Sequence, residues 1–75
     1  MGTAELHPKG MLKNYAEGKN MILVESGFSL RKVLLDAGIP PELVAMAFVN
    51  ETPKDKDEII NDGEIIDLVA VIGGG

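Results

Sequence analysis

The sequence contains no cysteine, and this absence excludes several classes of protein at once. Without a thiol the chain forms no disulfide, offers no thiolate ligand to a metal and has no cysteine nucleophile. Histidine is scarce too: His7 is the single imidazole, so a cluster of histidine ligands is also excluded. No apolar run is long enough to cross a membrane, and the first residues lack the basic start and apolar stretch of a secretion signal. We therefore expect a cytoplasmic protein without a membrane partner.

Basic residues are the minority of the charged residues. Twelve acidic residues against seven basic ones give a formal net charge of −5. An acidic chain repels phosphate groups, which argues against binding of nucleic acid and favours a protein partner with a basic docking surface. The chain has 75 residues, enough for one small domain with a single core but not for a deep cleft of its own. These properties argue against an independent enzyme and favour a module that acts inside a partner's active site.

The spacing of apolar residues and turn signals predicts an α+β domain. We expect strands and helices, in chain order, as strand 3–7, short helix 11–16, strand 21–25, helix 30–37, strand 44–50, helical turn 58–61 and strand 65–72. The helix over 30–37 is the clearest element, because Ser29 is a good N-cap and Gly38 followed by Pro40 ends it. This order predicts a sheet of four to five strands with one main helix packed on one face.

Several apolar side chains have an expected place in this domain. Met11, Leu12 and Tyr15 have the spacing of an inward helix face. The helical turn over 58–61 is expected to place Ile59 and Ile60 under the sheet. Three methionines, at positions 11, 21 and 46, are expected to fill the core and not to form a recognition surface.

Acidic residues are concentrated between the third and last strands, at Asp55, Asp57, Glu58, Asp62 and Glu64. Their spacing lacks the alternating oxygen ligands, central glycine and closing glutamate of a calcium loop, so we expect a solvated loop. The sequence contains no nucleophile–base pair, no glycine loop that leads into a helix and no metal-ligand spacing. We therefore expect no metal site.

The last strand alternates between two faces. One face carries Ile66, Leu68, Ala70 and Ile72, and the other carries Ile65, Asp67, Val69 and Val71. Asp67 marks the second face as outward, because burial of an unpaired carboxylate is costly. Val69 and Val71 are then exposed, and we expect them to form a docking surface together with Asp67. The alternative is that they have no role, since single exposed valines are common in strands.

Three glycines, Gly73, Gly74 and Gly75, follow the last strand. Glycine makes a thin chain with wide backbone freedom and contributes little to packing. We expect residues 1–72 to form the folded domain and residues 73–75 to form a flexible tail that threads into a partner's narrow channel. The reactive group would then be the carboxylate of Gly75. The alternative is a frayed end or the remnant of a linker.

From Asn61 to Gly75 an Asp-Gly turn, an apolar strand and a diglycine end occur together. The helix start at Ser29-Leu30, the stop at Gly38-Ile39-Pro40 and the strand end at Phe48-Val49-Asn50 fit the same pattern. In these features the chain resembles the ThiS/MoaD family of sulfur carriers, over nearly its whole length. Members of that family are small ubiquitin-like β-grasp proteins, so the resemblance implies this fold.

The resemblance also implies a mechanism. An E1-like adenylating enzyme of the MoeB/ThiF type would use ATP and magnesium to convert the Gly75 carboxylate to an acyl-adenylate, with Gly73 and Gly74 threaded through its channel. A sulfur donor would then give a C-terminal thiocarboxylate, which delivers its sulfur to a synthase. The protein would be a co-substrate and not an enzyme, and it would hold no cofactor permanently. Since cysteine is absent, the sulfur would have to be carried on the chain terminus.

Two sulfur pathways and two other functions fit the sequence. The long connection over 8–19 favours a molybdopterin- or tungstopterin-type carrier that serves the large subunit of molybdopterin synthase. The triple glycine fits a thiamin-type carrier that serves thiazole synthase, and Asn50-Glu51 replaces the Asn-Gly usual in both. The other functions are a ubiquitin-like modifier joined through Gly75 to lysines of its targets, and a passive β-grasp interaction module.

Overall fold

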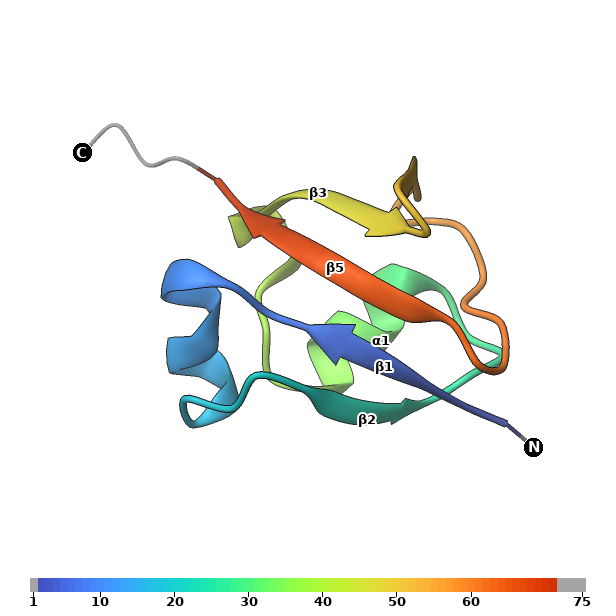
Figure 1. The fold of residues 1–75 in the computed structure, drawn as a ribbon, viewed down its shortest axis with the longest axis horizontal. Coiled ribbons are helices and arrows are strands. Elements are labelled where there is room, and N and C mark those ends of the chain that lie inside the picture. Colours follow the sequence, from blue (N-terminus) through green and yellow to red (C-terminus); the bar gives the residue numbers. More distant parts are fainter. Residues whose placement is uncertain (1, 72–75) are drawn as a thin grey trace.

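The computed structural model describes residues 2–71 and shows a five-stranded mixed sheet with helices packed against it (Figure 1). The strands are β1 (Thr3–His7), β2 (Ile22–Glu25), β3 (Val44–Val49), β4 (Thr52–Pro53) and β5 (Ile65–Ala70). One α-helix, α1 (Leu30–Asp36), is accompanied by two short 3-10 helices, η1 (Gly10–Ala16) and η2 (Pro41–Leu43). None of the helices within residues 2–71 has the length and apolar character needed to cross a membrane.

The strand order in the sheet is β2-β1-β5-β3-β4, so the last strand of the sequence lies in the middle. β5 pairs in parallel with β1 and antiparallel with β3, and β2 and β4 form the two edges. The register places His7 of β1 and Phe48 of β3 on either side of Asp67. The sheet is therefore held together through β5, whose two neighbours come from opposite halves of the sequence.

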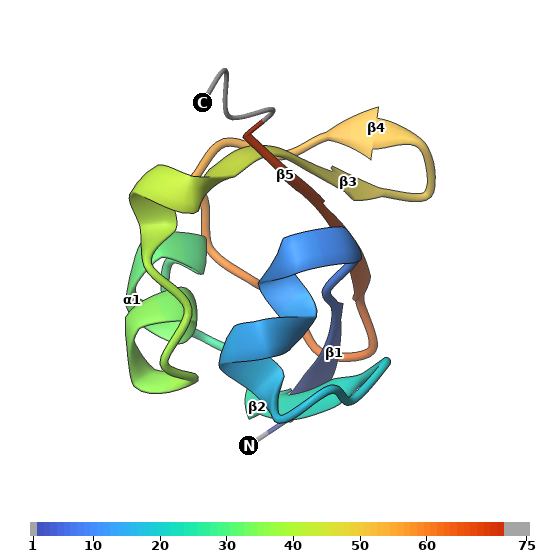
Figure 2. The same cartoon turned by 90° about the vertical axis from the view of Figure 1, so that its left-hand side faces the viewer.

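The core fills the space between the sheet and the helices. Figure 2 shows α1 set against one side of the sheet, which leaves the other side open. The fully buried side chains include Leu6, Ile66 and Leu68 from the strands, Leu30 and Leu34 from α1, and Leu12, Ile39 and Ile60 from the connections. Within residues 2–71, this core contains no charged side chain. A single apolar core of this kind agrees with the small size of the chain.

Both ends of α1 follow from local sequence. The Ser29 hydroxyl accepts a hydrogen bond from the Lys32 amide at 3.2 Å, which satisfies one of the free amides at the helix start. At the other end the Ile39 amide donates to the Leu34 carbonyl at 2.9 Å, while Gly38 takes a φ of +84°. This arrangement is a Schellman motif, which needs a left-handed residue after the helix. The predicted start and stop of the helix are confirmed.

The predicted helical turn over 58–61 is wrong. The segment is extended, and Ile59 forms an isolated antiparallel bridge with Ser29. The Ile60 amide donates to the Phe28 carbonyl at 2.8 Å, and the Leu30 amide donates to the Glu58 carbonyl at 2.9 Å. Because these backbone groups find partners beside the start of α1, the segment needs no helical hydrogen bonds of its own. Only Ile60 is buried, and Ile59 is exposed.

The helix expected over 11–16 is a 3-10 helix, and its inward face was assigned only in part. Leu12 is fully buried as expected, but Ala16 is its buried companion, while Met11 and Tyr15 are exposed. The expectation therefore identified one of the two buried residues of this helix, Leu12, and missed the other, Ala16.

The fifth strand, β4, arises from a tight turn after β3. Asn50 and Glu51 both have positive φ, 53° and 68°, as a two-residue type I′ hairpin turn requires. The chain therefore folds straight back, and Thr52 and Pro53 pair with Val49 and Phe48. The polar sequence over 51–57, with Pro53 and its charges, predicts a loop instead of a strand. The structure differs there, because β4 is only two residues long and lies at the edge of the sheet, where proline is tolerated.

Candidate functional site

The end of β5 is the part of the structure that leads to the glycines. β5 is paired on both sides, and after it the Val71 amide donates to the Leu43 carbonyl next to η2 at 2.9 Å. The backbone therefore has a defined position up to Val71. The residues expected to act chemically, Gly73, Gly74 and Gly75, lie outside the described residues, as does the expected boundary between domain and tail.

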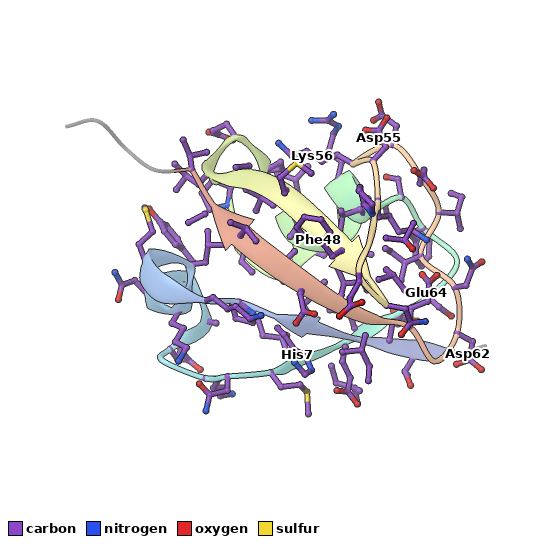
Figure 3. All side chains as sticks on the ribbon, turned by 45° about the horizontal axis from the view of Figure 1, so that its top comes forward. His7, Phe48, Asp55, Lys56, Asp62 and Glu64 are labelled. Atoms are coloured by element: carbon purple, nitrogen blue, oxygen red, sulfur yellow. The ribbon has the colours of Figure 1, made fainter. Side chains whose placement is uncertain are left out.

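The outer face of the sheet carries an apolar patch near this end. The side chains of Val69 and Val71 are 40% and 39% exposed, and Met46, opposite Val69 on β3, is 44% exposed. Phe48 lies opposite Asp67 and so shares the outer face with it (Figure 3). We call Met46, Phe48, Val69 and Val71 the outer patch. The patch brings together the two valines expected from the sequence and two residues of β3.

The two β3 members of the outer patch were missed because a β-bulge breaks the alternation of the strand. Val44 is buried, so regular alternation would also turn Met46 inward, as expected for a core methionine. The register shifts between Val44 and Met46, and Ala47 is buried in its place. Met46 is therefore turned outward. Met11 and Met21 are also exposed, so the expectation that the three methionines fill the core is wrong.

Polar groups border the outer patch on the β1 side. The Lys9 ammonium lies 3.3 Å from an Asp67 carboxylate oxygen, and both side chains are exposed. His7, opposite Asp67 on β1, has its Nε2 atom 2.9 Å from a Glu5 carboxylate oxygen. Exposed pairs of this kind contribute little to stability. The outer face is thus apolar over β3 and the end of β5 and polar over β1, a combination typical of protein interfaces.

A partly buried ion pair lies at the other end of β5. The Lys54 ammonium is 2.9 Å from Oε1 of Glu64, and the two side chains are only 8% and 19% exposed. Figure 3 shows Glu64 close to Asp62, at the end of the sheet where β5 begins. The same carboxylate accepts a hydrogen bond from the Asn61 amide at 2.8 Å. Glu64 therefore fixes the turn into β5, and the expectation that it belongs to a solvated loop is wrong.

Opposing influences set the pKa of the Glu64 carboxyl. Burial acts to raise the pKa of Glu64, but hydrogen bonds from the Asn61 amide and from Lys54 outweigh burial and hold the pKa below its ordinary value of 4.5. The Asn61 side chain also donates to this carboxylate, at 3.4 Å. A carboxyl with a lowered pKa that already accepts from three donors is poorly suited to proton transfer. We assign Glu64 to the structure of the turn. Within residues 2–71 no three acidic or histidine side chains gather in a way that would hold a metal ion.

The comparisons with known proteins address the fold. No protein-family model and no curated protein matches the sequence. Among solved structures, SAMP1 from Haloferax volcanii superposes with a TM-score of 0.69 over 99% of this chain and 100% of its own, at 16% sequence identity. The fold is a ubiquitin-like β-grasp. At this identity the likeness shows the fold alone.

The β-grasp architecture confirms the expected fold class. The sheet has five strands, mixed parallel and antiparallel, and α1 packs on one face, as the order of elements predicts. In this β-grasp the central strand β5 leads to the glycine segment, and the outer patch lies on the face opposite α1.

Proposed function

We propose that this protein is a carrier that holds an activated group on the carboxylate of Gly75, and that the group is sulfur, as in the ThiS/MoaD family. The observation that supports this proposal is the position of the outer patch. It lies at the end of β5, which is paired on both sides, and three glycines follow shortly after it in the sequence. A partner that binds this patch would receive the glycine segment at a fixed starting point. The absence of cysteine supports the same view, since no side chain offers another place for transferable sulfur.

The proposed reaction has two steps. In the first, an oxygen of the Gly75 carboxylate attacks the α-phosphorus of ATP in an E1-like enzyme of the MoeB/ThiF type, and pyrophosphate leaves. Magnesium in that enzyme would neutralise the phosphates. In the second, a sulfur nucleophile attacks the acyl carbon, AMP leaves and a thiocarboxylate forms. Activation is needed because a free carboxylate is a poor electrophile, whereas AMP is a good leaving group.

Named residues of this chain would act in those two steps. β5 and the hydrogen bond from Val71 to Leu43 fix the point at which the chain leaves the domain. Gly73 and Gly74 would provide a segment without side chains that fits a narrow channel. Asp67 and the outer patch would dock the domain against the enzyme. We further propose a cytoplasmic reaction whose sulfur goes to the large subunit of a molybdopterin- or tungstopterin-type synthase, with thiazole synthase as the other acceptor.

A mass measurement tests the carrier function. The protein is incubated with the E1-like enzyme of the same organism, ATP and sulfide, and its intact mass is recorded. We expect a gain equal to the difference between sulfur and oxygen, confined to the C-terminal peptide. A variant without Gly74 and Gly75 is the control: it should melt at the same temperature and gain no mass. An unchanged mass with an enzyme that is active on its own substrate would contradict the proposal.

The chain end and the acceptor need separate measurements. Protein purified from its own cells should have the intact mass of a chain whose last residue is Gly75. A larger mass, from residues retained beyond Gly75, would contradict a reactive carboxylate there. The thiocarboxylate form should then be mixed with each synthase in turn. Formation of the sulfur-containing product with one synthase and not the other would decide the pathway.

A second candidate function is protein modification. The structural neighbour SAMP1 is a ubiquitin-like small archaeal modifier protein, and the same acyl-adenylate would serve an isopeptide bond to lysine. The mass experiment distinguishes the two functions when cell extract replaces sulfide. Adducts whose tryptic peptides join Gly75 to a lysine of another protein would favour the modifier. A thiocarboxylate without such adducts would favour the carrier.

A further inference from the structure

The β2 edge of the sheet has unused backbone hydrogen-bonding groups. The Glu5 amide donates to the Glu64 carbonyl at 2.9 Å, so Glu5 directs its backbone groups toward β5. Leu23 lies opposite Glu5 in the antiparallel β1–β2 pair and therefore directs its own N–H and C=O away from β1. By the same alternation Glu25 also directs its groups outward. Within residues 2–71, no backbone hydrogen bond outside the strand ladders uses these groups.

A groove with mainly apolar walls runs beside this edge, between β2 and α1. It has a volume of about 300 Å³, and two acidic side chains, Glu25 and Asp36, line it beside apolar ones. Its apolar walls are Ile22 and Val24 from β2, Phe28 before α1, and Val33 and Ala37 at the helix. A second hollow continues it past Tyr15 and Met21 and shares Ile22, Leu23 and Ala37 with it. The charged residues of this hollow, Lys19 and Glu17, pair with each other at 3.5 Å. Figure 1 shows β2 at the edge of the sheet, on the opposite side of β5 from the strand β3 that carries half of the outer patch. The groove is thus separate from the outer patch.

The two faces of β2 carry different side chains, and this difference limits which strands can pair with its free edge. Ile22 and Val24 face the groove and are partly buried, whereas Leu23 is 62% exposed on the outer face with Glu25. Glu5 lies directly beside Leu23 on that outer face. Within residues 2–71 no cation lies within ion-pairing distance of Glu25. A strand added to this edge would therefore have apolar side chains toward the groove and basic side chains toward Glu25 and Glu5.

We propose that the β2 edge and its groove bind an extended segment of a partner protein in which apolar and basic residues alternate. The segment would add to the sheet beside β2, with main-chain hydrogen bonds to Leu23 and Glu25 for affinity and the alternation of side chains for specificity. Charge complementarity selects this occupant over a second copy of the chain. Each copy carries a net charge of −5, and edge-to-edge pairing of two β2 strands would bring their glutamates together. The inference does not depend on the proposed carrier function.

A capped peptide of alternating residues, Lys-Val-Lys-Val-Lys-Val-Lys, is the probe for this site. We expect it to bind the full-length protein and to shift the backbone amide resonances of β2 and of the residues that line the groove. The charge-swapped peptide, with glutamate in place of lysine, should bind about tenfold more weakly or not at all. Shifts confined to the outer patch would overturn the proposal, as would equal binding of the two peptides.

Leu23→Pro tests the backbone contact. Because the Leu23 amide points away from β1, proline at this position removes no hydrogen bond of the sheet but removes the donor that an added strand needs. We expect about tenfold weaker binding of the lysine peptide. Leu23→Thr is the matched control, since it loses the leucine side chain and keeps the amide, and its affinity should stay close to that of the unaltered protein. Equal losses in the two variants would contradict strand addition.

Glu25→Lys tests the charge selection with a variant that leaves the strand backbone unchanged. It should weaken binding of the lysine peptide by about tenfold and improve binding of the glutamate peptide. Sedimentation of the unaltered protein without peptide shows whether β2 pairs with a second copy. A stable dimer that the lysine peptide does not dissociate would overturn the choice of occupant, and a monomer agrees with it.

Discussion

Glu51 has a backbone conformation that suits glycine better than glutamate. Its φ of 68° lies in the left-handed region, where a Cβ atom crowds the following carbonyl. We expect Glu51→Gly to raise the free energy of unfolding by about 1 kcal/mol, because glycine is free of that crowding. Urea denaturation measures the change. Glu51→Ala keeps the Cβ atom and is expected to gain much less, so equal gains would show that the glutamate side chain and not the backbone angle is the cause.

The pair of Lys54 and Glu64 gives a second prediction for single residues. Glu64→Gln leaves the Lys54 ammonium, which is 8% exposed, without its counter-charge. We expect the free energy of unfolding to fall by about 2 kcal/mol, measured by urea denaturation at neutral pH. Glu42→Gln is the control for loss of a carboxylate, since Glu42 is exposed and its substitution should change stability by less than about 0.5 kcal/mol.

The lowered pKa of Glu64 adds a dependence on pH. The unfolded chain, with the ordinary pKa near 4.5, binds the proton before the folded protein does as the pH falls. The stabilisation by the ionised carboxylate is therefore complete above that pKa and is lost as the pH falls through the lowered pKa. We expect the free energy of unfolding of Glu64→Gln to depend less steeply on pH below about 4.5. Equal slopes for the two proteins, from denaturation at stepped pH, would contradict this.

Single residues also mark the limit of what the sequence predicts. Glu64 looks like one member of an acidic loop, because its partner Lys54 lies on the β3–β4 hairpin and no local pattern connects the two. Met46 looks like a core residue, because the bulge that turns it outward has no glycine or proline as a signal. Both cases depend on which strands become neighbours. That information lies in the tertiary structure and not in local spacing.

Elements with strong local signals were predicted well. α1 has its start and stop encoded in Ser29 and Gly38, and β1 spans the residues expected from the sequence. The segment over 58–61 lacked such signals, and its hydrogen bonds to the start of α1 decided its extended form. The exposed face of β5 could be predicted too, because Asp67 interrupts an otherwise apolar strand. Its neighbours on β3 could not, since the register of a sheet is a long-range property.

At the level of the strand, β5 carries the prediction for docking. We expect Val69→Asp to weaken binding to the E1-like enzyme by about tenfold or more, because it places a charge in the apolar patch. The free energy of unfolding should change by about 1 kcal/mol at most, since Val69 is half-exposed. Titration calorimetry and thermal unfolding measure the two effects. Val71→Asp tests the same patch beyond the end of the strand.

Two controls accompany this docking prediction. Val69→Thr keeps the branched shape of the side chain and should bind nearly as well as the unaltered protein. Leu35→Asp introduces the same charge on α1, on the other side of the sheet, where Leu35 is exposed. Its binding should not change. A loss of affinity in Leu35→Asp equal to that in Val69→Asp would indicate a general effect of charge and would remove the outer patch as the docking site.

For the whole molecule, the net charge of −5 predicts how association depends on salt. A partner with a basic docking surface attracts the chain over a distance that salt shortens. We expect the association rate with the E1-like enzyme to fall by about tenfold between low and high ionic strength, while the dissociation rate changes little. Stopped-flow fluorescence measures both rates. An association rate that is independent of salt would show that the acidic charge has no part in docking.

The fold of the whole chain was easier to predict than its function. The order of strands and helices and the resemblance to ThiS/MoaD carriers led to the ubiquitin-like β-grasp, which the likeness to SAMP1 supports. The proposed reactive carboxylate of Gly75 stays a prediction, because the structure describes the chain only to Val71. The groove beside β2 could not be predicted, because its walls come from β2 and α1, and no local sequence pattern indicates that these two elements lie side by side.

The position of β5 also has a consequence for biosynthesis. It is synthesised after the other four strands of the sheet and lies in the middle of it. Before it emerges, the hairpins on either side have nothing to join them, and an isolated hairpin is marginally stable at best. A copy that terminates before β5 would lack the strand that joins the two hairpins, so we expect it to stay unfolded and to be exposed to proteolysis. Cellular quality control would thus remove copies without β5 before they could occupy a partner.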